Sequence, residues 1–353
     1  MQLYMPTKIY SEKECVVAHG KELRNLGTKA MIVTGKTSAV KTGALADVVQ
    51  ALEQTPYVIF DQIEENPSIE TALQAQKIAV EEKADFFIGI GGGSAMDAAK
   101  AISLLAKNFP KGEEILYDPT VLPYYPVVCI PTTCGTGSEA TPYAILTIHK
   151  KQTKKSISHR IYPELSLLDD QYLRFMPRHI LVNTCVDALA HLLESYLNTN
   201  TNELNRVYSR EGLMLWRTFR DHLLEDRVTE EDYKNMLHAS MLAGLAITHT
   251  GTSLPHGLSY AVTYSLGIPH GKAVGIFLGG YVDNGTQDAA DAVNLLGFET
   301  TGDFRSYMKA LLGEADIPED LLRTAAKMIM ADPGKLKNCP FPVTEEQLIG
   351  MLN

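Results

Sequence analysis

Four side chains in the second half of the chain have the types and spacing of ligands for one metal ion. Asp187 and His191 lie one helical turn apart, so a helix places both on the same face. His256 and His270 each stand between a proline and a glycine, which predicts helix edges and tight backbone rather than mid-helix positions. Three imidazoles and one carboxylate suit a divalent cation such as Fe²⁺ or Zn²⁺.

The same residues also allow a purely structural interpretation. An Asp/His pair at helical spacing arises on many helices by chance, and a proline and a glycine around a histidine also occur in simple turns. The repetition of the Pro-His-Gly triplet favours a metal site. Two motifs in the first half of the chain favour it further.

A glycine run in the first half has the character of a phosphate-binding loop. A buried strand is predicted over 85–90, and it leads directly into Gly91, Gly92, Gly93 and Ser94 and then into a helix over 95–105. Glycines at this junction let backbone amides approach a pyrophosphate, and the helix N-terminus favours negative charge. The run differs from the G-x-G-x-x-G fingerprint, and a flexible turn is the alternative. Asp97 is expected in the first turn of the helix, where a carboxylate suits the helix dipole. It is also one of the candidate cofactor-binding residues.

The second motif follows a strand predicted over 127–130. The segment 131–139, Pro-Thr-Thr-Cys-Gly-Thr-Gly-Ser-Glu, is dense in hydroxyls and glycines. Such a segment at the carboxyl end of a buried strand suits a polar ligand. The alternative is a Thr/Ser-rich loop that caps a helix.

The elements that must position these residues divide the chain into two domains. In residues 1–176, strands alternate with helices. The strands are a strand or hairpin at the start, Ala30–Thr34 and Tyr57–Phe60. One helix follows the loop 35–38 and runs to about residue 52, and another runs from the N-cap Ser68 to about residue 83. This alternation predicts an α/β domain with a Rossmann-like parallel sheet. Residues 177–353 carry mainly helical patterns, over 186–197, 203–224, 230–246 and much of 280–330, and predict an all-α domain. A capping box at 344–347 predicts a short last helix.

Composition excludes several classes of protein. The 353 residues carry a formal net charge of -10 without a basic stripe, so no nucleic-acid partner is expected. No uncharged apolar run reaches about 18 residues, so no membrane span is expected. Five cysteines without a C-x-x-C motif indicate a reducing compartment. The first residues lack a basic region followed by an apolar one, so we expect no signal peptide and a cytoplasmic location.

Four motifs together resemble the iron-containing (group III) alcohol dehydrogenases over nearly the full length of the chain. They are GGGSAMDAAK at 91–100, PTTCGTGSEAT at 131–141, VDALAHLLE at 186–194, and the Pro-His-Gly triplets around His256 and His270. The resemblance implies a dinucleotide-binding α/β domain, a helical domain and a homodimer. It assigns the metal to Asp187, His191, His256 and His270, the pyrophosphate to Gly92, Gly93 and Ser94, and further cofactor contacts to Thr132, Thr133 and Thr136. Asn66 and Lys155 match further cofactor positions of the family less closely.

The choice of nicotinamide cofactor depends on the loop after the first predicted Rossmann strand. Family members that prefer NAD often carry an Asp there, which meets the adenosine ribose and repels a 2′-phosphate. Here Gly35 takes that position, and Thr37, Ser38 and nearby lysines follow. This pattern resembles the butanol-dehydrogenase-like branch and favours NADP(H) over NAD(H). Some members also carry a second histidine near the substrate where this chain has Tyr260.

These residues predict a metal-dependent alcohol dehydrogenase or aldehyde reductase that transfers a hydride between NADP(H) and a primary alcohol or aldehyde. A polyol dehydrogenase that acts on glycerol or propanediol with NAD is the alternative within the family. A lyase like dehydroquinate synthase would need a Lys/Arg cluster beside the metal ligands, and the helical half has no obvious one. A non-catalytic nucleotide sensor would be expected to have lost ligands, whereas all four are present.

Three further expectations concern single residues. Leu254, Phe277 and Met241 either line an apolar substrate pocket or belong to the helix core. His249 and Tyr260 are candidates to line a proton route. Cys185, which precedes the predicted metal helix, is expected to be a small buried residue.

Overall fold

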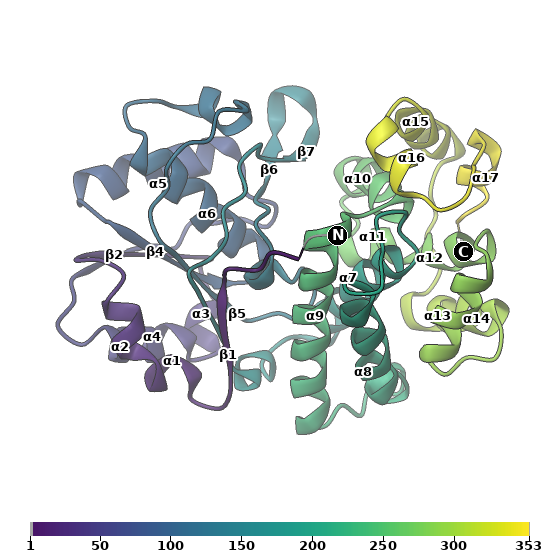
Figure 1. Ribbon diagram of the computed structural model, residues 1–353, viewed down its shortest axis with the longest axis horizontal. Coiled ribbons are helices and arrows are strands. Elements are labelled where there is room, and N and C mark those ends of the chain that lie inside the picture. Colours follow the sequence, from purple (N-terminus) through teal and green to yellow (C-terminus); the bar gives the residue numbers. More distant parts are fainter. Residues whose placement is uncertain (1–2, 353) are drawn as a thin grey trace. The chain divides into compact units, whose positions relative to one another are not determined.

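The computed structural model describes residues 3–352, which fold into two compact units (Figure 1). One unit comprises Tyr4–Thr133 and Ser138–Met176. The other contains Pro177 onward and also the short segment Cys134–Gly137. In the described residues, no helix is both long enough and apolar enough to cross a membrane.

The first unit is built on a six-stranded parallel sheet with the strand order β1-β8-β5-β4-β2-β3. Its strands are β1 (Lys8–Ser11), β2 (Ala30–Thr34), β3 (Tyr57–Phe60), β4 (Phe86–Gly91), β5 (Val127–Pro131) and β8 (Leu165–Leu168). Every residue of β2, β4, β5 and β8 is buried. Parallel strands are covered on both faces, which explains their continuous apolar sequences.

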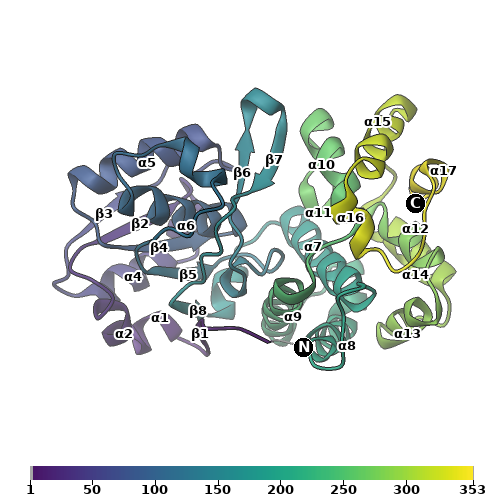
Figure 2. The same cartoon turned by 45° about the horizontal axis from the view of Figure 1, so that its top comes forward.

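Alternate residues along a strand lie in two separate apolar layers, one on each face of the sheet. Met31 and Val33 pack with α5 (Ile69–Glu81) and α6 (Gly93–Lys107), whereas Ala30 and Ile32 pack with α1 (Cys15–Ala18) and α4 (Ala44–Leu52). Figure 1 and Figure 2 show α5 and α6 on one side of the sheet and α1 and α4 on the other. The predicted Rossmann-like α/β fold is therefore confirmed.

Two local predictions differ from the structure. At the start of the chain, the strand alternative is confirmed by β1 and the hairpin alternative is wrong: β1 pairs with the distant β8, and α1 and α2 (Gly20–Arg24) follow it. The helix predicted between the loop 35–38 and about residue 52 is broken into α3 (Ser38–Lys41) and α4, because Gly43 adopts a left-handed conformation with φ 85° between them. The N-cap role of Ser68 is confirmed, since its side chain accepts a hydrogen bond from the Thr71 amide.

The remaining elements of this unit are short. They are the antiparallel pair β6 (Ile145–Ile148) and β7 (Thr153–Ser156) and the 3₁₀ turns η1 (Glu113–Tyr117), η2 (Ser138–Ala140), η3 (His149–Lys151) and η4 (Asp170–Leu173).

A fully buried lysine ties α6 to the segment after β5. The Lys100 ammonium group donates to the backbone and hydroxyl oxygens of Ser138, both at 2.7 Å, and to the carbonyls of Thr141 at 3.0 Å and Tyr143 at 2.9 Å. Its charge lies 3.7 Å from a carboxylate oxygen of Asp97. A buried ammonium group is tolerated only when it is paired and hydrogen-bonded in this way.

Glu139 lies in the same segment and is only 1% exposed. Burial raises the pKa of its carboxyl group to about 7, although the positive charge of Lys100 opposes that shift. The native protein therefore keeps a proton on Glu139 at pH values where an exposed glutamate has lost it.

The second unit is helical throughout its described residues beyond Met176, as predicted. Its helices are α7 (Arg178–Tyr196), α8 (Arg206–Leu224), α9 (Glu230–Thr250), α10 (Leu254–Leu266), α11 (His270–Gly275), α12 (Leu278–Asp283), α13 (Gln287–Leu295), α14 (Thr301–Leu312), α15 (Glu319–Met330), α16 (Pro333–Asn338) and α17 (Glu345–Ile349). The capping box that begins α17 is confirmed, with Thr344 and Gln347 bonded reciprocally.

Helix α7 is the centre of this unit. Every residue from Cys185 to Tyr196 is buried, and α8, α9 and α11 pack around the helix. A helix that is buried all round must have its polar groups paired by neighbours. The polar groups of α7 are therefore placed by the helices around it.

We expect Lys100→Met to lower the free energy of unfolding by about 3–5 kcal/mol, because the substitution leaves a buried carboxylate and several carbonyls without their cation. Urea denaturation of the metal-free protein measures this change. Lys77→Met, at an exposed lysine of α5, is the matched control and should change stability by less than about 0.5 kcal/mol. Equal stability of the two variants would contradict the structural role of Lys100.

Because the pKa of Glu139 is raised in the native state, we expect the free energy of unfolding to decrease as the pH rises. The ordinary pKa of a glutamate is 4.5, and the pKa of Glu139 in the native state is about 7. Between these two pH values the unfolded chain has released this proton, whereas the native state still holds it. Stability is therefore lost through this window, by up to about 3 kcal/mol. Glu139→Gln should remove this decrease in urea denaturation between pH 5 and pH 8, whereas Glu70→Gln at an exposed site should not. Parallel pH profiles of the parent and Glu139→Gln would show that Glu139 titrates normally.

Candidate metal centre and cofactor loops

Two of the predicted metal ligands project from one buried face of α7. Asp187 and His191 are 4% and 6% exposed, and Asp187 Oδ1 lies 4.0 Å from His191 Nε2. The His191 Nδ1–H donates to the carbonyl of Gly135 at 3.3 Å. This bond directs Nε2 toward the carboxylate.

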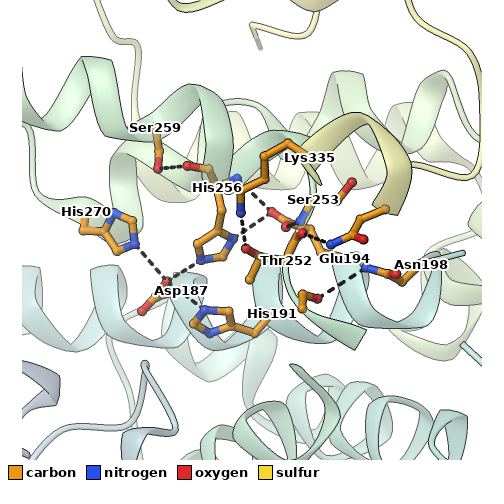
Figure 3. Close-up of polar contacts among 12 residues, drawn as sticks. Asp187, His191, Glu194, Asn198, Thr252, Ser253, His256, Ser259, His270 and Lys335 are labelled. Atoms are coloured by element: carbon orange, nitrogen blue, oxygen red, sulfur yellow. Dashed lines mark hydrogen bonds and ion pairs between the residues drawn. The ribbon is translucent and has the colours of Figure 1, made fainter. Parts of the chain in front are cut away.

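The other two histidines enter at the beginnings of two helices, as their flanking prolines predict. Pro255 occupies the first turn of α10 ahead of His256, and Pro269 precedes His270, the first residue of α11. Their Nε2 atoms lie 3.3 Å and 3.8 Å from Asp187 Oδ1. Figure 3 shows all three imidazoles turned toward this one carboxylate.

Asp187, His256 and His270 fit a divalent metal ion, because one ligand atom of each lies within 4.8 Å of the others. His191 is outside this group, although its Nε2 lies 4.0 Å from Asp187 Oδ1. Asp187 Oδ1 and His256 Nε2 are buried, and neither atom makes a well-formed hydrogen bond within the described residues. Buried polar atoms left in this way usually serve a ligand or ion. The 3.3–4.0 Å separations between the oxygen and the nitrogens match donors that share an ion at about 2.0–2.2 Å from each.

Electrostatics keep the carboxylate ionised. Burial by itself would raise the pKa of Asp187, but His191, His256 and His270 hold it well below its usual range. Burial lowers the pKa of His191 to about 4, so this imidazole is neutral and able to coordinate. The pKa of His256 is raised to about 9 because Glu194 and Asp187 outweigh the opposing effect of burial.

Sequence reasoning assigned no role to Glu194, although the residue closes the VDALAHLLE motif. It is completely buried on α7 and hydrogen-bonded to His256. The available signal was its position one helical turn beyond His191 on a helix of apolar residues. Tyr260 stacks on His270 with ring centroids 6.0 Å apart.

The predicted cofactor loops follow neighbouring strands of the first unit. β2 and β4 are adjacent, yet the chain moves outward from β2 to β3 and then returns to the other side of β2 through β4. In open α/β sheets, ligands bind beyond the carboxyl ends of the strands at such a switch in strand order. The segment with Gly35, Thr37 and Ser38 follows β2, and the segment with Gly92, Gly93 and Ser94 follows β4.

The glycine loop depends on close backbone packing. Gly91 has φ 151°, and a Cβ atom there would lie 2.9 Å from the Ala95 side chain. A Cβ atom on Gly92 would lie 3.1 Å from the Thr133 hydroxyl. Thr132 and Thr133 follow β5, the next strand along the sheet, and the buried Thr132 hydroxyl has no partner in the described residues. Thr136, in contrast, belongs to the segment Cys134–Gly137 of the second unit.

Asn66 lies with the glycine loop, and the neighbouring lysine is Lys154 rather than Lys155. The backbone N–H of Asn66 donates to Ser94 Oγ at 3.1 Å. Lys154 Nζ donates to the side-chain oxygen Oδ1 of Asn66 at 2.8 Å. Successive residues of β7 point to opposite faces. Lys155 consequently lies over the Tyr117 ring, 5.3 Å from its centroid. The structure thus separates Lys155 from the other predicted cofactor residues.

Asp97 is not in the first turn of α6, so that prediction was wrong. The helix begins two residues earlier than predicted, at Gly93, which leaves its first turn without an acidic residue. The Asp97 carboxylate accepts hydrogen bonds from the Ser138 hydroxyl at 2.5 Å and the Ile145 amide at 2.9 Å. The Asp97 carboxylate therefore links α6 to the segment of the chain that follows β5.

Four other residues named from the sequence make contacts within the protein. Leu254 and Phe277 are fully buried. His249 Nδ1 bonds to the Leu245 carbonyl of its own helix at 2.8 Å. Cys185 is a buried thiol, as expected, with its sulfur 3.7 Å from that of Cys134.

Comparison with known proteins agrees with this arrangement. The sequence profile described as "Iron-containing alcohol dehydrogenase" matches residues 6–170, and the profile of the C-terminal part of the Fe-containing alcohol dehydrogenase family matches residues 181–353. The chain belongs to the iron-containing alcohol dehydrogenase family. The family resemblance drawn from the four motifs is thereby confirmed, and with it the class of oxidoreductases.

Individual relatives extend the comparison. A crystal structure of an iron-containing alcohol dehydrogenase from Thermotoga maritima has a TM-score of 0.91 and 33% identity, and the match covers 99% of this chain and 98% of that one. Alcohol dehydrogenase 4 of Schizosaccharomyces pombe is 30% identical over 78% of this chain. The matches span 66% of that enzyme's length and 59% of the hydroxyacid-oxoacid transhydrogenases of two Caenorhabditis species.

Gly271 sets the position of His270 and generates a prediction for the metal centre. A Cβ atom at Gly271 would lie 1.8 Å from the Asn183 carbonyl oxygen of α7, so Gly271→Ala must push α11 away. We expect zinc affinity, measured by chelator competition, to fall at least about tenfold. Gly257→Ala is the matched control after His256, because its Cβ meets the movable end of Ile329, 2.4 Å away. Comparable zinc affinities of the two variants would contradict this prediction.

Proposed function

We propose that this protein is a metal-dependent alcohol dehydrogenase or aldehyde reductase that transfers a hydride between NADP(H) and a primary alcohol or aldehyde. The observation that carries the proposal is the convergence of three imidazole Nε2 atoms on one buried carboxylate oxygen. This donor set matches what Fe²⁺ or Zn²⁺ requires in a catalytic site.

The residues of the centre would hold Fe²⁺ or Zn²⁺ through Asp187, His191, His256 and His270. When bound, the metal would act as a Lewis acid toward an alcohol or carbonyl oxygen. The single carboxylate leaves a net charge of about +1 with a divalent ion, which favours a developing negative charge on the substrate oxygen. The buried α7 keeps the ligands aligned, because neighbouring helices surround it.

The cofactor is proposed to bind at the switch in strand order. Gly92, Gly93 and Ser94 offer backbone amides at the N-terminus of α6 for a pyrophosphate. Asn66, Thr132, Thr133 and Thr136 are proposed as further contacts, with Lys154 in place of Lys155.

The preference for NADP(H) is proposed from the loop after β2. The segment 35–43 contains lysines and hydroxyl side chains and no acidic residue. Lys36, Thr37 and Lys41 are exposed and therefore accessible to a 2′-phosphate. An NADPH-dependent butanol dehydrogenase of Clostridium saccharobutylicum is 27% identical over 79% of this chain, which supports both this cofactor and an aliphatic substrate.

A polyol or hydroxyaldehyde substrate is the second candidate. The lactaldehyde reductase of Escherichia coli is 29% identical over 71% of this chain, which supports a short substrate with a neighbouring hydroxyl group. A homodimer and a cytoplasmic location are proposed from the family resemblance and the cysteine content.

Initial rates with butyraldehyde test the proposal. We expect metal-dependent oxidation of NADPH after reconstitution with Fe²⁺ or Zn²⁺, at least about tenfold faster than with NADH, which corresponds to about 1.4 kcal/mol of discrimination. A chelated sample should be inactive. Propanediol and lactaldehyde, assayed in parallel, distinguish the second candidate.

The substitution Asp187→Ala distinguishes loss of the metal-dependent activity from loss of cofactor binding. Activity should fall more than about a hundredfold, the upper end of what loss of a supporting residue costs, while NADPH binding is retained. A faster rate with NADH would remove the 2′-phosphate proposal and leave the reaction class. Unchanged activity of Asp187→Ala would contradict the metal-dependent function. If the protein shows no activity on any simple aldehyde or diol, that result would favour a lyase or a nucleotide sensor.

A further inference from the structure

One buried carboxylate beside the metal centre lies outside the ligand set. Glu194 is completely buried on α7, the helix that also carries Asp187 and His191. An ionised carboxylate in such a place is costly unless donors satisfy it. Its partners therefore show what the residue does.

Within the described residues, the hydrogen bonds that Glu194 accepts come from the beginning of α10. Oε1 accepts from the His256 amide at 2.9 Å and from His256 Nδ1 at 2.7 Å, and Oε2 accepts from the Ser253 amide. The side chain of Ser253, the N-cap residue, makes no capping bond itself. Glu194 thus satisfies amides that the helix start would leave without partners, and its charge suits the helix dipole.

The bond to His256 determines which ring nitrogen faces the metal centre. With Nδ1–H donating to Glu194, the opposite nitrogen, Nε2, is directed at Asp187 Oδ1, 3.3 Å away. Figure 3 shows His256 between the two carboxylates. Two contacts from one residue, to the ring and to the backbone of His256, leave the imidazole little freedom to rotate.

A nearby cation balances this second buried charge. Lys335 of α16 donates to the Thr252 hydroxyl at 2.5 Å, and its positive charge favours the ionised form of Glu194. Asn338 of the same helix donates to the Thr252 carbonyl at 2.8 Å. Helix α16 therefore holds the segment before α10 in place.

We propose that Glu194 is a positioning residue that presents His256 to the metal through Nε2, so that metal affinity depends on a carboxylate that does not touch the ion. The inference rests on the proposed metal-dependent function and adds a residue to it. In metal sites, a carboxylate behind a coordinating histidine fixes the tautomer and ring orientation and makes the nitrogen more basic.

Glu194→Gln tests this role, because it keeps the shape of the side chain, removes the negative charge behind His256 and replaces one acceptor oxygen with an NH₂ group. We expect zinc affinity, measured by competition with a chromophoric chelator, to fall about 10–100-fold. The metal-free variant should retain its helical circular dichroism. Zinc affinity equal to that of the parent would overturn the proposal.

Asp232 provides a matched control within the same unit. This buried carboxylate accepts from the Thr229 amide at 2.7 Å and from His222 Nδ1 at 2.9 Å, so it also joins a helix start to an imidazole. His222 is not one of the four proposed ligands. Asp232→Asn should lose stability by the same mechanism and keep its zinc affinity within about twofold. An equal loss of zinc affinity in both variants would assign Glu194 a merely structural role.

A measurement on the unaltered protein keeps the proposal falsifiable if Glu194→Gln does not fold. In ¹⁵N-histidine NMR of the zinc-loaded chain, His256 should show a protonated, strongly hydrogen-bonded Nδ1 and a zinc-bound Nε2. Zinc on Nδ1 would overturn the proposal. If Asp187→Ala binds zinc as tightly as the parent does, the proposed metal centre itself fails; normal parent binding with an unaffected Glu194→Gln rejects only the role of Glu194.

Discussion

The second unit depends on the compensation of negative charge inside a buried helix. Asp187 and Glu194 both lie on the part of α7 that neighbouring helices cover completely. Each carboxylate would be strongly unfavourable alone. The imidazoles of His191, His256 and His270 face the first, and the amides that begin α10 satisfy the second. The same contacts that stabilise the helix packing therefore assemble the ligand set.

The first unit contains a buried positive charge that also needs polar partners. Lys100 is buried in α6, and the carbonyls after β5 surround its ammonium group. The contact joins α6 to the segment from Ser138 to Tyr143. In both units, a buried ionic group is hydrogen-bonded to a polar segment of the backbone.

Most of the fold was predictable because its signals are local. The apolar strands of the parallel sheet, the N-cap Ser68 and the capping box of α17 are encoded by neighbouring residues, and the structure confirms them. The hairpin alternative at the start of the chain failed because β1 pairs with β8, far away in the sequence. The break between α3 and α4 depended on the conformation of Gly43, and Asp97 was misplaced because α6 begins earlier than the predicted helix.

The sequence by itself determined the residue types of the candidate site. A carboxylate and an imidazole one helical turn apart must share a helix face, and prolines before His256 and His270 limit them to helix starts. Only the tertiary structure decided that these helix starts meet at Asp187, that Lys154 rather than Lys155 accompanies Asn66, and that Glu194 stands behind His256. Spacing along one element is a property of local geometry, whereas contacts between elements depend on how their buried faces pack.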